Sequence, residues 1–137
     1  MDREDIKEAA VSAIQYVLDG DHSSAMRIVR DLLDTGDPRA VYGACGAWAG
    51  SGEVALEATD GKRAAGDWTL FDIHPSGLAG TAEETFGLRF VTAYCNADWP
   101  TTAALFNAAS SAGGKQFQRS VVAVLAVGAE LNARVTR

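Results

Sequence analysis

Two histidines and two cysteines are the side chains of this 137-residue chain best suited to catalysis or metal binding. His74 follows Asp72 by two residues, so a carboxylate is close enough in sequence to orient its imidazole ring. His22 stands near an expected helix start, where capping or exposure is the simpler interpretation. The histidines are not spaced as metal ligands with each other or with Cys45 and Cys95. The pattern therefore favours a structural hydrogen bond for His74 and predicts neither a metal nor a cofactor.

Both cysteines lie among apolar residues in helical patterns, which predicts two buried thiols. The sequence alone leaves a disulfide between Cys45 and Cys95 open, but the reducing cytoplasm disfavours one. A catalytic pair of Cys95 and His74 would require a proximity that spacing does not reveal. No Gly-x-Ser-x-Gly motif is present to supply a serine-hydrolase nucleophile. No catalytic set is identified, and enzymatic activity has no support in the residues.

Two polar segments resemble ligand-binding loops but lack residues that such loops require. In SSAGGKQ the lysine is Lys115, but Ala109 replaces the first glycine of a phosphate-binding loop and Gln116 replaces its Ser or Thr. Aspartates near the expected helix ends lack the ligand spacing and closing glutamate of a calcium loop: Asp19, Asp21, Asp31, Asp34 and Asp37. We interpret them as solvated helix ends, and neither a nucleotide site nor a calcium site is predicted.

Composition predicts one globular domain over residues 1–137. Hydrophobic residues make up 47% and charged residues 22%, and a chain of this length buries about two-thirds of the surface of its unfolded form. The formal net charge of −6 disfavours nucleic acid and anionic lipid as partners, although Lys62 and Arg63 form a local basic pair. The charged start MDREDIKEAA and the lack of a long apolar run predict a cytoplasmic protein outside the membrane.

Apolar periodicity predicts an all-α fold of about six helices, in two three-helix halves joined by an irregular middle with one short extended segment. In the first half, a stripe over residues 6–18 predicts one helix, and Ser23 or Ser24 can cap a second. Asp37-Pro38 predicts the start of a third helix, whose signal weakens after residue 50. Its buried residues are expected at helical spacing: Val41, Ala44, Cys45 and Trp48.

In the second half, Thr81 and Glu84 have the spacing of a capping box, and the last helix is expected over residues 115–135. That helix contains VVAVLAVGA, residues 121–129, which is apolar on every side. It must therefore lie at the centre of the fold or under a second subunit, and we expect a homodimer through it. The predicted core comprises Ile14, Val17, Ile28, Val29, Leu32, Trp48, Phe90, Tyr94, Leu105, Val121, Val124 and Leu125.

The two halves can be compared as an internal repeat. A shift of 78 residues aligns Tyr16 with Tyr94, but it also sets Leu32 against Ser110 and breaks the inner apolar stripe. Shared helix-turn-helix spacing is therefore preferred over a duplication.

Residues 13–38, AIQYVLDGDHSSAMRIVRDLLDTGDP, carry small and aromatic residues at the spacing of a helical hairpin. Ala13, Tyr16, Gly20 and Ala25 match a small residue, an aromatic residue, a turn glycine and an alanine of the tetratricopeptide repeat family. The segment thus resembles one tetratricopeptide-type hairpin, which implies two closely paired helices. Pro38 comes one position late, and no second copy follows at the family's period of about 34 residues. The whole arrangement is similar in style to small helical proteins of high-GC actinobacteria and their phages, which implies no activity.

The stretch GDWTLFDIHPSG, residues 66–77, places large apolar side chains between turn residues. Its bulky residues predict a short strand or an ordered extended loop over 68–73, with alternate side chains on opposite faces. Trp68 and Asp72 would then share one face, and Phe71 and Ile73 the other. Three roles stay open: a plug between the halves, an apolar surface that meets a partner, or an edge strand paired across a homodimer.

These observations predict a non-catalytic helical interaction or adaptor module that binds a protein partner or a second copy of itself. The candidate contacts are Trp68, Phe71, Asp72 and His74, with Phe71 expected to point outward. The alternative is a small-molecule-binding or enzymatic protein with a pocket between the helical halves and Trp68, Asp72 and His74 at its mouth. A DNA-binding regulator comes third and is disfavoured by the net charge.

Overall fold

Seven helices make up the fold in a computed structural model that describes residues 1–64, 66–75 and 80–135. In chain order they are α1 (Arg3–Leu18), α2 (His22–Asp34), α3 (Pro38–Asp60), α4 (Leu70–Ile73), α5 (Ala82–Cys95), α6 (Trp99–Ala112) and α7 (Gly114–Val135). These residues contain no strand, so the predicted all-α fold class is confirmed. The helix beyond the expected six is α4, a single turn in the middle of the chain.

Side-chain caps fix where most of the helices begin. Thr81 caps α5 as predicted, because its side chain accepts the backbone N–H of Glu84. The expectation that Ser23 or Ser24 caps α2 is wrong. Asp21 is the cap: its carboxylate accepts the backbone N–H of Ser24 at 3.1 Å and the Ser24 hydroxyl at 2.7 Å. Asp21 takes the role because its two carboxylate oxygens accept both donors of Ser24.

Helix α3 is longer than the sequence predicts and runs to Asp60. Gly52, which weakens the sequence signal, is buried where α3 meets α7, and a Cβ there would lie 2.8 Å from Leu131 Cδ1. The glycine therefore serves close helix packing and does not end the helix. Gly61, whose φ is 82°, ends it instead.

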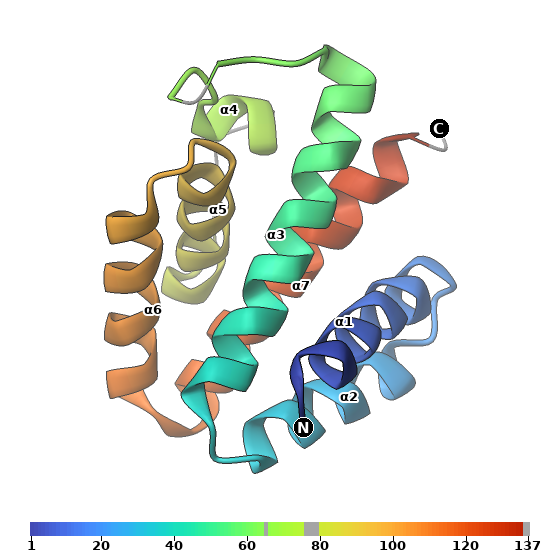
Figure 1. The fold of residues 1–137 in the computed structure, drawn as a ribbon, viewed down its shortest axis with the longest axis vertical. Helices are drawn as coiled ribbons and strands as arrows, with labels where there is room; N and C mark the ends of the chain where they lie inside the picture. The colour runs from blue at the N-terminus through green and yellow to red at the C-terminus, as the bar shows by residue number, and fades with distance from the viewer. Residues whose placement is uncertain (65, 76–79, 136–137) are drawn as a thin grey trace.

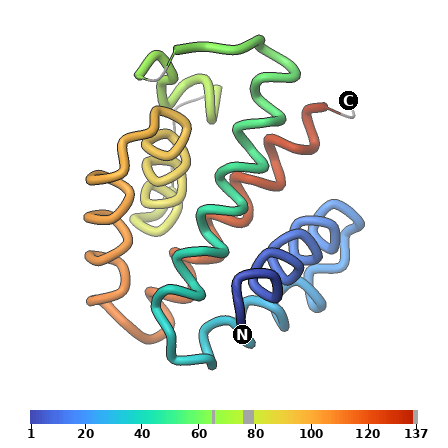
Figure 2. Tube along the Cα trace, viewed as in Figure 1, coloured from blue at the N-terminus to red at the C-terminus, as the bar shows by residue number. Residues whose placement is uncertain are grey.

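Helices α3 and α7 lie side by side through the middle of the molecule and run in the same direction (Figures 1 and 2). A Cβ on Gly128 would lie 2.7 Å from the carbonyl oxygen of Trp48, so the two backbones pack in direct contact. The buried Trp48 indole donates a hydrogen bond to the carbonyl of Ala10 at 3.0 Å and ties α1 to this centre. In Figure 1, α1 and α2 flank the central pair on one side, and α5 and α6 flank it on the other.

The apolar run at residues 121–129 is covered by the chain itself. Val121, Val124 and Leu125 are buried, and within the run only Ala126 is exposed. Of the two explanations for this run, the central position is therefore the one observed. A homodimer through α7 no longer follows from the pattern, because its apolar side chains already have intramolecular partners.

The predicted core lies mostly inside the molecule. The buried members are Ile14, Val29, Leu32, Trp48, Phe90, Val121, Val124 and Leu125. The members that are only partly buried, and pack against the edge of the core, are Val17, Ile28, Tyr94 and Leu105. They stand at the margins of their helical stripes, where only one side of a large side chain reaches the interior.

The turn between α1 and α2 and the turn between α5 and α6 have matching caps, 77 residues apart in the sequence. Asp21 caps α2 and Asp98 caps α6, and each carboxylate accepts a backbone N–H and a hydroxyl from the residue three positions later. Just before these caps, Gly20 and Ala97 both have positive φ, 80° and 54°. The shift of 78 residues considered from the sequence is one residue longer than the shift of 77 that aligns these caps. That one residue is enough to set Leu32 against Ser110 and break the apolar stripe.

Candidate functional site

The segment expected to be extended over residues 68–73 contains a turn of helix instead. Thr69 and Asp72 form a capping box: the Asp72 carboxylate accepts the backbone N–H of Thr69 at 2.7 Å and its hydroxyl at 3.0 Å. The Thr69 hydroxyl in turn accepts the backbone N–H of Asp72, so each residue caps the other and the pair fixes the single turn of α4. The same spacing was recognised at Thr81, and it was the signal that could have predicted this helix.

The side chain of Trp68 is only 3% exposed and plugs the interior beneath this turn. Asn96, at the end of α5, holds the backbone on either side of the indole. Its Oδ1 accepts the N–H of Gly66 at 3.1 Å and of Trp68 at 2.9 Å, and its Nδ2 donates to the carbonyl of Trp68 at 2.8 Å. The position of the plug is therefore set by specific hydrogen bonds as well as by apolar burial.

Two arginines fix the turn from outside. Arg63 pairs with the Asp72 carboxylate at 2.8 Å, and its guanidinium lies 4.4 Å from the centre of the Trp68 ring. Arg134 of α7 donates to the carbonyl oxygens of Asp72 at 3.1 Å and Ile73 at 2.6 Å. Hydrogen bonds from Thr69, and then the guanidinium of Arg63, lower the pKa of Asp72. Arg63, noted in the sequence as half of a basic pair, is thus engaged within the molecule.

The four predicted contact residues do not share one environment. Trp68 is buried, and Asp72 is used by Arg63 and by its own turn. Phe71 is 64% exposed, as expected for an outward-facing residue. His74 is partly buried, and its backbone N–H donates to the carbonyl of Leu70 at 2.8 Å. The end of the stretch, residues 76 and 77, lies outside the described residues.

The prediction that Phe71 and Ile73 share a face is wrong. Ile73 is 2% exposed and lies inside with Trp68, whereas Phe71 faces solvent. In a helix, residues two apart point in different directions. Because the segment forms a helical turn where an extended segment was predicted, these two side chains lie on different sides. The edge-strand explanation is excluded for residues 70–73 for the same reason.

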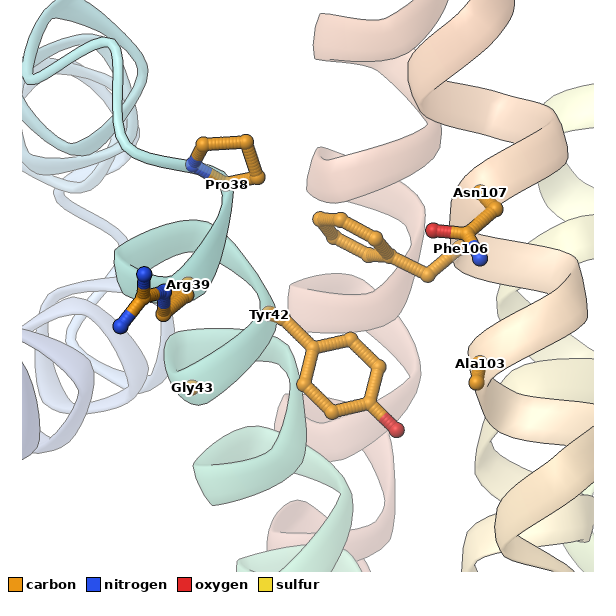
Figure 3. Close-up of a pocket in the computed structure, with 7 residues that line it drawn as sticks. All are labelled: Pro38, Arg39, Tyr42, Gly43, Ala103, Phe106 and Asn107. Atoms are coloured by element: carbon orange, nitrogen blue, oxygen red, sulfur yellow. The ribbon is translucent and has the colours of Figure 1, made fainter.

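A pocket does lie between the two halves, but other residues form it. It has a volume of about 330 Å³ and is lined from α3 by Pro38, Arg39, Tyr42 and Gly43 and from α6 by Ala103, Phe106 and Asn107 (Figure 3). The rings of Tyr42 and Phe106 meet edge to face at 5.0 Å, and the Tyr42 hydroxyl is hydrogen-bonded to Thr102 at 2.8 Å. None of the five pockets described in the structure is lined by Trp68, Asp72 or His74.

The two cysteines lie in the interior of the fold. Cys45 and Cys95 are both buried free thiols, and burial raises the pKa of each to about 12. In the described part of the chain, no group of three or more His, Cys, Asp or Glu residues is placed to hold a metal ion. Lys115 follows the start of α7 and is preceded by helix α6, where a phosphate-binding loop would have a strand.

Compared with known proteins, the chain matches no family model, no curated protein and no solved structure. Residues 13–38, which carry the tetratricopeptide-type spacing, comprise the end of α1, all of α2 and the first residue of α3. None of the described helices combines the length and apolar character needed to cross a membrane.

Proposed function

We propose that this protein is a non-catalytic helical interaction module of the cytoplasm, homodimeric, and that it contacts a protein partner through Phe71. The observation that carries the proposal is the exposure of a large aromatic side chain, 64%, on a turn that is fixed from several sides. Asn96, Arg63 and Arg134 all hold this segment. A preorganised aromatic residue loses little conformational entropy on binding, which is typical of an interface anchor.

Within this proposal the predicted residues have different tasks. Trp68 and Asp72 position the turn from beneath and from the side, and Phe71 makes the contact. His74 is the residue that ends α4, three positions after Phe71.

The proposal is tested by comparing how tightly the wild type and two variants, at Phe71 and at a control position, bind a protein partner. A partner captured from the native host would be purified, and its affinity would be measured by calorimetry for the wild type, Phe71→Ala and Val11→Ala. Val11 is the control because it is an apolar residue of similar exposure, 62%, on α1. We expect Phe71→Ala to weaken binding by about 2 kcal/mol or more with unchanged thermal stability, and Val11→Ala to bind like the wild type. Equal affinities for all three proteins would contradict the role of Phe71.

A second function, small-molecule binding, is favoured by the pocket between α3 and α6. Its volume of about 330 Å³ is at the lower end of the range for ligand sites, and it combines aromatic walls with Arg39 and Asn107. A thermal-shift screen against metabolites distinguishes the two functions, because a specific ligand raises the melting temperature by mass action. A hit that is lost in Asn107→Ala and kept in Phe71→Ala would favour the pocket.

A further inference from the structure

The outward side of α3 carries opposite charges at its two ends and small or apolar residues between them. Arg39, Gly43, Gly50, Val54 and Glu57 recur at helical spacing and so lie along one side. Arg39, Gly43 and Val54 are exposed, and Gly50 and Glu57 are partly buried. Tyr94 of α5 packs against this face at Gly50, where a Cβ would lie 3.3 Å from the Tyr94 hydroxyl oxygen. The face is basic at its start, at Arg39, and acidic five turns later, at Glu57.

The side chain of Val54 is largely uncovered within the chain, whereas its counterpart in the second half is buried. Its side chain is 67% exposed, whereas Leu131, which stands 77 residues later in the repeat, is 1% exposed. Leu131 is covered because it packs over Gly52 of the neighbouring helix, with its Cδ1 2.8 Å from where a Cβ would be. A branched apolar side chain over a helical glycine is therefore a contact that this fold already uses once.

Gly43 offers the matching space on the same helix face. A Cβ there would be in ordinary van der Waals contact with Ile6 Cγ2, at 3.5 Å, and Gly43 itself is exposed. It belongs to a surface hollow of about 830 Å³ that also includes Lys7 of α1, Gly46 of α3 and Tyr94 of α5. Gly43 lies 11 residues before Val54, or about 16 Å along the helix axis.

We infer that a second copy of the chain occupies this face, with the two α3 helices antiparallel about a two-fold axis near Ala47 and Gly50. In that arrangement Val54 of each copy enters the space over Gly43 of the other, and Arg39 of each lies near Glu57 of the other. Both pairings follow from one register, because the residues of each pair are almost equally distant from the axis along the helix. A face that complements itself in this way forms a closed dimer. The inference rests on the proposed function, since it locates the self-association which that function includes.

The charges at the acidic end support this pairing. Glu53 and Glu57 are neighbours on α3, and burial followed by the charge of Glu57 raises the pKa of Glu53. The acidic end is therefore short of positive charge within one copy. At the other end, Arg3 and Lys7 stand beside Arg39 around the hollow, with no Asp or Glu among its lining residues. In the antiparallel dimer the basic end of α3 in one copy lies against the acidic end of α3 in the other. The excess positive charge and the excess negative charge then offset each other.

Charge reversal and restoration test the register. The dimer dissociation constant would be measured by sedimentation velocity for the wild type, Arg39→Glu, Glu57→Arg and the double variant. We expect each single reversal to weaken the dimer about tenfold or more, and the double variant to restore it. Gly43→Leu should prevent dimerisation by filling the space over Gly43. Ser12→Leu, at a helical position on α1 that is also exposed, should have no effect.

Cross-linking gives a second readout that does not depend on stability. Ala47→Cys, near the proposed axis, should form a disulfide-linked dimer under mild oxidation, and Ser12→Cys should not. Cys45 and Cys95 will not interfere because they are buried. A wild type that stays monomeric at high concentration would overturn both this inference and the homodimer in the proposed function. A dimer that is unaffected by the α3 variants but lost in Phe71→Ala would overturn this inference alone, because self-association would then use the α4 surface.

Discussion

The two halves of the molecule share their turns but differ in how much apolar surface they leave uncovered. Val11, Leu18 and Val54 of the first half are exposed by 62%, 41% and 67%. The residues 77 positions later are Leu88, Cys95 and Leu131, and all three are buried.

A repeated scaffold therefore accounts for the fold, and the departures from the repeat show where apolar side chains stay uncovered within one chain. The second half is preceded by the segment that carries the Trp68 plug and α4, and Asn96 at the end of α5 holds this segment. The corresponding residue of the first half, Asp19, instead accepts a hydrogen bond from Gln15 of its own helix, at 3.0 Å. At the matched positions the uncovered apolar side chains thus belong to the first half, whereas the exposed apolar side chains of the second half are Trp99 and Val135, at 52% and 49%.

The largest expected effect comes from removing the plug. Trp68→Ala should lower the free energy of unfolding by about 3–5 kcal/mol, because a buried indole is lost and the cavity can close only in part. Phe71→Ala, three residues away and exposed, should change it by less than about 0.5 kcal/mol. Chemical denaturation of the two variants measures both values. A loss below about 1 kcal/mol for Trp68→Ala would mean that the segment does not support the second half.

The buried glycine of α5 should be more sensitive than its counterpart in α1. A Cβ on Gly87 would lie 2.9 Å from the backbone carbonyl of Ala123, so Gly87→Ala should cost about 1–3 kcal/mol of stability. The equivalent residue, Ala10, already carries a methyl group, and Ala10→Gly should cost about 1 kcal/mol or less. If both variants lost equal stability in urea denaturation, the difference in helix approach between the halves would be disproved.

The paired turns allow a smaller, reciprocal test. Gly20 and Ala97 have positive φ, a conformation that favours glycine. Gly20→Ala should lower stability by about 1 kcal/mol, and Ala97→Gly should raise it by about 0.5 kcal/mol. Thermal unfolding of the two variants should shift in opposite directions, and shifts of the same sign would show that the turns are not equivalent.

The smallest effect is an acid-induced loosening of α4. The pKa of Asp72 is lowered in the folded protein, so the ionised carboxylate stabilises the fold above its ordinary pKa of 3.8. That stabilisation is lost as the pH falls through the lowered value. The amide NMR signal of Thr69, which donates to this carboxylate, should move over the same pH range. In Asp72→Asn the movement should disappear, and its persistence would assign it to another group.

Much of the fold could be predicted from the sequence because its helices follow apolar periodicity and local caps. The buried positions of α3, including Cys45 and Trp48, were found in this way. The prediction failed where tertiary contacts decide the outcome, since Gly52 resembles a helix break until Leu131 is seen to pack over it.

The candidate site was only partly predictable for similar reasons. The exposure of Phe71 was expected, and the Thr69–Asp72 spacing contained the signal for α4. The hydrogen bonds from Asn96 and Arg134 join segments far apart in the sequence, and no local pattern indicates them. The exposure of Val54 likewise became meaningful only beside its buried counterpart in the other half.

Methyl NMR of Val54 and Leu131 during dilution tests the difference between the halves most directly. If the first half is covered only by a second copy, the Val54 methyl signals should shift as the protein is diluted from high concentration. The Leu131 signals should stay fixed, because that residue is already buried within one chain. Val54 signals that do not change across the concentration range would contradict the account.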